Sequence, residues 1–234
     1  MSAKYRVILE ELENDIISGK YNEVKKLPTE EDLMKQYQVS RTTIRKAISV
    51  LVSRGYVYQI QGSGIFLRES ALKGYLSLES LKGLTRDYPN KKIVSKVIEL
   101  KLIQANEKIA SQMKCDVNSL VYFLKRIRFI DEKPLTTEHT YFNKKVIPYM
   151  NEEIAQKSIY SYIIDDLGYH IGFADKVIYA DKLDSENASY FELSEGEPAL
   201  IIESVEFLST GDVFAVSKSI HNYKSTKLLK LSTF

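Results

Sequence analysis

The chain has 234 residues, of which 44% are hydrophobic and 27% are charged, and its formal net charge is +2. These values are ordinary for a globular protein, and the length suits two domains or one large one. No apolar run approaches the roughly 18 residues that a membrane span needs, and the N-terminus has no apolar signal segment. The single cysteine, Cys115, excludes an internal disulfide and makes a poor zinc site. These features predict a cytoplasmic protein.

Charge is unevenly distributed over the first part of the chain. Residues 10–32 carry eight acidic residues, whereas residues 33–68 carry none and hold six basic ones. The basic residues are Lys35, Arg41, Arg45, Lys46, Arg54 and Arg68. Such a window builds a positive face, which attracts a polyanion, although a solvated surface alone could also account for it.

Two helices are predicted before residue 38. In the first, four apolar residues recur at helical spacing, and Gly19 is placed to end the helix in a left-handed turn. These residues are Tyr5, Ile8, Leu12 and Ile16. The second helix begins after Thr29, a predicted N-cap, with Asp32 as the return half of a capping box. It stops near Tyr37.

A third helix is predicted from its N-cap, Ser40, to a stop at Gly55. Its buried stripe consists of Ile44, Ala47, Ile48 and Leu51. Near its start, the outward residues are Arg41, Thr42, Arg45, Lys46 and Ser49. In a helix-turn-helix, the first residues of the second motif helix face base edges in the major groove. Arginine can hold guanine O6 and N7 in a bidentate pair, while hydroxyls and backbone amides hold phosphates.

A β-hairpin is predicted directly after the third helix. Residues 56–60 and 65–68 alternate as short strands around the turn Gln61-Gly62-Ser63-Gly64. Beside a helix-turn-helix this hairpin is a wing, and glycine at its tip lets the backbone approach DNA closely. The alternative is a generic three-helix domain with an exposed basic face.

Three segments of this region carry a family resemblance: Leu27-Pro28-Thr29-Glu30, Val39 to Ala47, and Gly62 to Leu67, with Gly55 between the last two. They resemble the GntR family of bacterial regulators. The resemblance implies DNA contacts from Ser40, Arg41, Thr42, Thr43, Arg45, Lys46, Gly62 and Gly64. Some members have a DNA-contacting arginine where this chain has Glu31. Either that contact is absent here, or Lys26 or Lys35 replaces it.

Residues 1–69 are therefore predicted to be the winged helix-turn-helix domain, residues 70–76 a linker, and residues 77–234 a second domain. Two parts of the second domain repeat the order helix, strand, turn, strand. The predicted strands are 120–130 and 135–142 in the first part, and 199–208 and 213–220 in the second. A helix at 158–167 and a strand around 176–183 lie between the two parts. The pattern predicts an α+β domain, with one antiparallel sheet and helices on one side.

The second domain also carries a resemblance, in residues spread over most of its length. They are Lys125 to Arg128, Pro134-Leu135, Glu138, Tyr141, Ser158 to Tyr160, Leu193, Gly196 to Pro198, Phe214 and Ser217 to Ser219. They resemble the UTRA effector domain of the HutC subgroup of GntR proteins, whose fold is similar to chorismate lyase. The resemblance implies a homodimer formed largely through this domain, a palindromic double-stranded operator, and loss of DNA affinity when a ligand binds.

Two arginines are the main candidates for ligand binding. Arg126 and Arg128 lie two residues apart on a predicted strand, so both project from one face. A buried guanidinium needs an anionic partner, which can be a protein group or a ligand. In sugar-phosphate-sensing relatives, the matching effector-binding positions are Arg126, Arg128, Glu138, Ser158 and Tyr160. The alternative is that both arginines pair with Glu138 or Glu206 and bind nothing. Where those relatives have a hydroxyl-reading glutamate, this chain has Ala215, so the ligand stays open.

The expected function is a ligand-responsive DNA-binding regulator, a repressor by family precedent, that is released by a small anionic effector such as a sugar phosphate. Two alternatives stay open: an enzyme that uses the lyase-like second domain, and a DNA-binding protein without a ligand. The three histidines, His139, His170 and His221, lie far apart and lack metal-ligand spacing. We expect no catalytic residues, no metal and no cofactor.

Overall fold

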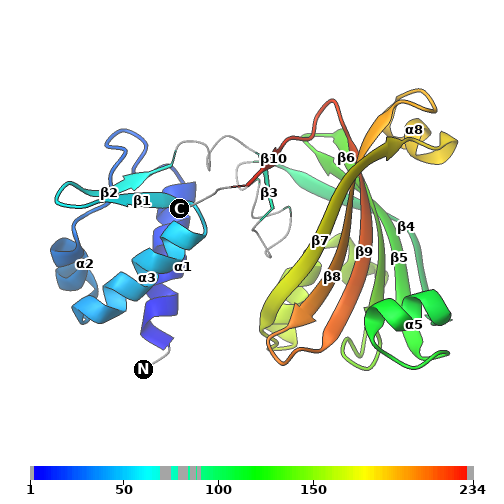
Figure 1. Cartoon of the computed structure of the whole chain (residues 1–234), viewed down its shortest axis with the longest axis horizontal. Coiled ribbons are helices and arrows are strands. Elements are labelled where there is room, and N and C mark those ends of the chain that lie inside the picture. Colours follow the sequence, from blue (N-terminus) through cyan, green and yellow to red (C-terminus); the bar gives the residue numbers. More distant parts are fainter. Residues whose placement is uncertain (1–2, 69–74, 79–83, 85–87, 89–90, 231–234) are drawn as a thin grey trace. The chain divides into compact units, whose positions relative to one another are not determined.

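The computed structural model describes residues 3–68, 75–78, 84, 88 and 91–230. It divides into two compact units (Figure 1). The first unit contains residues 1–80, 87–90 and 228–234, and the second contains residues 81–86 and 91–227. Residues 70–74 of the predicted linker lie outside the described residues.

The first unit begins with the three predicted helices: α1 (Ala3–Ile17), α2 (Glu30–Tyr37) and α3 (Arg41–Ser53). The capping box is confirmed, since the Thr29 hydroxyl accepts from the Asp32 amide and the Asp32 carboxylate accepts from the Thr29 amide. Ser40 caps α3 by accepting from the Thr43 amide. These caps satisfy amides that have no partner within the helix, and they fix where α2 and α3 begin.

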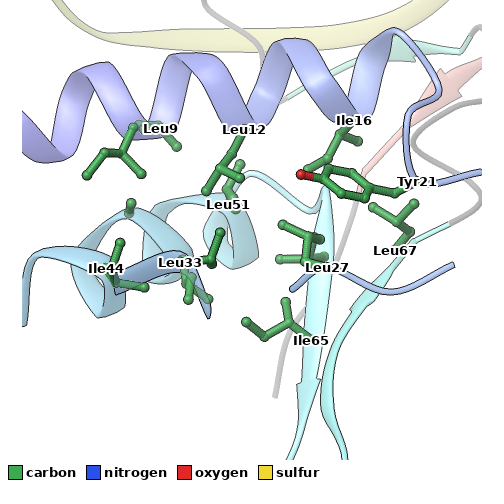
Figure 2. Packing of buried hydrophobic residues seen from close by; sticks show 14 residues of the cluster. Leu9, Leu12, Ile16, Tyr21, Leu27, Leu33, Ile44, Leu51, Ile65 and Leu67 are labelled. Atoms are coloured by element: carbon green, nitrogen blue, oxygen red, sulfur yellow. The ribbon is translucent and has the colours of Figure 1, made fainter. Parts of the chain in front are cut away.

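The wing is also present. Strands β1 (Val57–Ile60) and β2 (Gly64–Leu67) pair antiparallel. One apolar core joins the wing to the helices (Figure 2). Its largest members with no exposed surface include Leu12, Ile16, Leu33, Ile44 and Leu51. The core fixes α3 with its predicted stripe inward, so the other side of α3 faces solvent.

The first unit contains one pairing that the sequence did not indicate. Strands β3 (Leu76–Ser77) and β10 (Leu228–Leu229) pair parallel over two residues. The end of the chain therefore returns to the segment that follows the wing. Each strand has only two residues, which is too short for a periodic pattern.

The second unit is built on a six-stranded antiparallel sheet in the order β4-β5-β6-β9-β8-β7. The strands are β4 (Ile93–Gln104), β5 (Leu120–Ile130), β6 (Lys133–Asn143), β7 (Ile171–Lys182), β8 (Pro198–Leu208) and β9 (Val213–Asn222). Both predicted hairpins form, and they meet where β6 pairs with β9. The α+β fold class is confirmed.

Helices cover both faces of this sheet, so the expectation that they lie on one side was wrong. The helices are α5 (Glu107–Met113), α6 (Glu152–Gln156), α7 (Ile159–Ser161), the π-helix η2 (Tyr162–Asp166) and α8 (Ser185–Phe191). Val121 of β5 packs with α5, whereas Leu124, three residues on and therefore on the other face, packs with the segment α6–η2. Figure 1 shows α8 near one end of the strands and α5 near the other. Alternation along the strands does not show which helix covers each face.

Candidate functional site

The expected DNA-contacting residues of α3 lie at its solvent-facing start. The side chains of Ser40, Arg41, Thr42, Arg45 and Lys46 are exposed, and Thr43 is half-buried. The Ser40 and Thr43 hydroxyls lie 2.9 Å apart at the cap. The Lys46 ammonium lies over the Tyr5 ring, 4.4 Å from its centre, so this lysine also contacts α1. The arrangement suits a helix whose first turn enters a groove.

The wing tip is built on two glycines with positive φ, Gly62 at 77° and Gly64 at 124°. An added Cβ at Gly62 would meet nothing within 4 Å, so the tip is open on that side. At Gly64, a Cβ would lie 2.5 Å from the Lys26 side chain. Lys26 in turn lies over the Phe66 ring, 5.3 Å from its centre. Lys26 is therefore positioned beside the wing.

Acidic residues of α2 contact both arginines of α3. The Arg45 Nε donates to both Glu30 carboxylate oxygens, at 3.0 and 3.1 Å. The Arg41 Nη2 donates to Glu31 at 3.4 Å. Glu31, which departs from the family pattern, is therefore paired with a residue expected to contact DNA.

In the second unit, Arg126, Arg128 and Glu138 lie together on the sheet face that the segment α6–η2 covers. Strand pairing places Arg126 directly opposite Glu138. The Arg126 Nε donates to Glu138 at 2.6 Å, and its Nη1 donates to the carbonyls of Ala155 and Lys157 at 2.8 and 3.3 Å. Protein groups therefore already bind two nitrogens of this guanidinium.

Arg128 is also buried, but its guanidinium has fewer protein partners than that of Arg126. Its side chain is 6% exposed, and its only ion-pair contact within the described residues is Nη1 to Glu138 at 3.7 Å. Its Nε is buried and has no hydrogen-bond partner there. Burial lowers the pKa of Arg128 to about 10; Glu138 opposes this shift and Arg126 adds to it. A guanidinium in this state favours an additional anionic partner.

Two further buried polar atoms on this face have no partner among the described residues: His221 Nδ1 and Ser204 Oγ. His221 belongs to the same row across the sheet as Arg128, since Thr136 of β6 pairs with both. Burial lowers the pKa of His221 to about 4, so this imidazole is neutral at pH 7. Such a cluster of unpaired donors and acceptors is uncommon in a folded protein.

Glu206 and Tyr160 complete the polar group. Arg126, Glu138, Ser219 and Ile202 form one row across the sheet, so Glu206, four residues beyond Ile202 on β8, points to the same face. Burial raises the pKa of Glu206 to about 7, although a hydrogen bond with Tyr160 opposes the shift. Burial also raises the pKa of Tyr160.

The charge balance of the cluster follows from these shifts. Burial raises the pKa of Glu138, but the Arg126 and Arg128 guanidiniums outweigh it and hold that pKa below its usual value. Two guanidiniums thus share one ionised carboxylate, and burial raises the pKa of the second carboxyl group, Glu206, to about 7. The cluster can accommodate added negative charge.

The predicted effector residues are not equally well connected. Arg126, Arg128 and Glu138 are in contact, and Tyr160 reaches the cluster through Glu206. The Ser158 hydroxyl instead caps α7 by accepting from the Ser161 amide at 3.3 Å.

Sequence reasoning missed His221 and Ser204, and it considered Glu206 only as an ion-pair partner. The sequence shows that these residues alternate with apolar residues along β8 and β9. That alternation points to the cluster only when the pairing of the strands is known.

Within the described ranges, no three His, Cys, Asp or Glu side chains are grouped closely enough to hold a metal ion. Over the same residues, none of the helices is long and apolar enough to cross a membrane.

Comparison with known proteins covers both units. Residues 4–67 match the family described as "Bacterial regulatory proteins, gntR family", and residues 90–227 match the family described as "UTRA domain". The chain is 37% identical over 226 residues to the HTH-type transcriptional regulator YydK of Bacillus subtilis, covering 97% of this chain and 96% of that protein. The crystal structure of YydK superposes with a TM-score of 0.82 at 35% identity, covering 98% of this chain and 99% of that one.

A more distant relative has a name that mentions a compound. The mannosyl-D-glycerate transport/metabolism system repressor MngR of Escherichia coli is 26% identical over 227 residues, covering 95% of this chain and 94% of that protein.

Proposed function

Because the chain belongs to the gntR family of bacterial regulatory proteins and carries a UTRA domain, we propose that it is a transcriptional repressor of the HutC subgroup whose operator affinity falls when a small anion binds the second unit. The observation that carries the ligand part is Arg128, a buried guanidinium whose Nε has no partner among the described residues. The proposal includes a cytoplasmic homodimer that acts by binding and not by catalysis.

The DNA part of the proposal assigns contacts to the exposed start of α3 and to the wing tip. The residues are Ser40, Arg41, Thr42, Thr43, Arg45, Lys46, Gly62 and Gly64. Arg41 and Arg45 would read bases, and the hydroxyls and wing amides would hold phosphates. One winged helix buries too little surface for tight specific binding, so two copies would read a palindromic operator.

The ligand part follows from charge and hydrogen bonding. The Arg128 guanidinium has one long ion-pair contact with Glu138, at 3.7 Å, among the described residues. An anion that binds beside Arg128 would neutralise its charge. Tyr160 of α7, and Glu206 and Ser204 on the sheet face that α7 covers, can exchange hydrogen bonds with hydroxyl groups. A phosphorylated sugar offers both kinds of group. The name of the E. coli relative supports this chemistry, since mannosyl-D-glycerate is a sugar derivative that carries a carboxylate.

A matched ligand screen tests the proposal. We expect sugar phosphates to raise the melting temperature of the full chain, and the same sugars without phosphate to raise it less. At 100 times its dissociation constant a ligand stabilises by about 2.7 kcal/mol. The best phosphate should also release a duplex that the protein has selected from a random pool, as measured by fluorescence anisotropy.

The outcomes separate the candidate functions. Stabilisation by a neutral compound but by no anion would refute the role of Arg128. Binding of the selected duplex that responds to no compound would favour a DNA-binding protein without a ligand. Conversion of the compound, detected by mass spectrometry, would favour an enzyme.

A further inference from the structure

Two acidic residues at the start of α2 contact the α3 arginines through different guanidinium nitrogens. Glu30 binds Arg45 through Nε, and among the described residues no partner is found for the two terminal amino groups of Arg45. Those groups can meet guanine O6 and N7 while Glu30 keeps its contact. The Arg41 Nε also lies 3.9 Å from Glu30, whereas Glu31 binds Arg41 at Nη2, a terminal amino group. A base or phosphate that approaches Arg41 therefore competes with Glu31 for the same edge.

The Glu31–Arg41 pair lies in solvent and is not needed to build the unit. The side chains of Arg41 and Glu31 are 53% and 72% exposed. The start of α2 is already capped by Thr29 and Asp32. Exposed ion pairs of this kind are weak, so DNA can displace the carboxylate.

We propose that Glu31 sets the operator affinity by competing with DNA for Arg41. The inference rests on the proposed DNA contact of Arg41. Glu30 contacts both arginines at Nε, which leaves their terminal amino groups to DNA, whereas Glu31 occupies a terminal amino group of Arg41 that DNA needs. A complex gains the Arg41 contact only after the Glu31–Arg41 pair is broken.

The first test is Glu31→Gln, which keeps the shape of the side chain and removes its charge. We expect the dissociation constant for the selected duplex to fall about 2- to 5-fold at 0.1 M salt, the worth of an exposed ion pair. The gain should shrink at 0.5 M salt, because exposed charges are screened. Glu10→Gln removes an exposed charge from α1 and should leave affinity unchanged. The melting temperature of Glu31→Gln should match the wild type, which excludes a structural effect.

The second test is a double-mutant cycle with Arg41→Ala. If Glu31 acts through Arg41, Glu31→Gln gains nothing in the Arg41→Ala background. An equal gain in both backgrounds would show direct repulsion of DNA and overturn the proposal. If Arg41→Ala weakens binding but Glu31→Gln has no effect in the wild type, the competition is refuted while the proposed DNA contact stands. If Arg41→Ala has no effect, the assigned contact itself fails.

Discussion

Replacing Arg128 by methionine should stabilise the second unit and remove its response to an anion. Burial lowers the pKa of Arg128 from 12.5 to about 10. At 1.36 kcal/mol for each pKa unit, this burial costs the charged form about 3 kcal/mol. The folded-state pKa lies below the unfolded one, so this cost applies at every pH at which the arginine is charged. Methionine removes the charge and fills similar space, while Glu138 loses a contact at 3.7 Å. We expect a net gain of about 1–3 kcal/mol.

The neighbouring arginine supplies the matched control, with the opposite sign. Arg126 donates to Glu138 at 2.6 Å and to the carbonyls of Ala155 and Lys157. Arg126→Met would leave a buried carboxylate and two carbonyls without their donor. Breaking a buried pair in this way costs about 3–5 kcal/mol. Two equally conservative changes on one strand face should therefore shift stability in opposite directions.

Calorimetry of the full chain measures both changes. For a unit of this size, 1 kcal/mol shifts Tm by roughly 2–4 °C, so Arg128→Met should raise Tm by roughly 2–12 °C and Arg126→Met should lower it by roughly 6–20 °C. The sugar phosphate that stabilises the wild type should have no effect on Arg128→Met. A lower Tm for Arg128→Met would show that its guanidinium is satisfied by the protein, and the argument for an anionic ligand would fail.

Three further measurements test other parts of the account. Arg45→Ala should weaken operator binding by about 1–3 kcal/mol and relax preference at one base pair; equal weakening on random duplexes would make Arg45 a phosphate contact. Burial raises the pKa of Glu206 from 4.5 to about 7, so the folded state binds more protons than the unfolded state between these two values. The free energy of unfolding of the wild type should therefore fall as the pH rises from about 4.5 to about 7, and Glu206→Gln should lack this fall. Identical pH profiles of Tm for the two proteins would contradict that burial. Finally, the full chain should sediment as a dimer at micromolar concentration and give two-fold symmetric footprints, whereas a monomer with a single half-site footprint would contradict the proposed assembly.

Much of the first unit could be predicted because its structure is determined by signals close together in the sequence. Thr29 with Asp32, and Ser40 with Thr43, fix the starts of α2 and α3 through hydrogen bonds three residues apart. Gly55, with φ of 73°, follows Arg54, the C-cap of α3. The apolar stripe of α3 then determines which side faces solvent. These local rules are sufficient to place the expected DNA contacts.

In the second unit, the hairpins were predictable but the pairing between them was not. β5–β6 and β8–β9 follow from alternation around short turns, whereas the pairing of β6 with β9 joins residues about 80 positions apart. Strand β4 was missed, although it alternates between half-buried and exposed residues along much of its length. The predicted helix 158–167 divides into α7 and a π-helix, in which the Leu167 amide donates to the Tyr162 carbonyl five residues earlier.

The anion site proposed at Arg128 depends on those long-range pairings. The sequence offers Arg126 and Arg128 as equivalents, both on one strand face, and leaves open whether protein carboxylates satisfy them. Only the fold separates them, because α6 brings the Ala155 carbonyl to Arg126 and brings no such group to Arg128. Thr136 pairs with both Arg128 and His221, so the His221 Nδ1, which has no partner among the described residues, lies in the same row of the sheet as the undercompensated cation. A protein that bound nothing there would be more stable with apolar residues at these positions. In the proposed function, an anion bound at this place restores the stability that these polar residues cost.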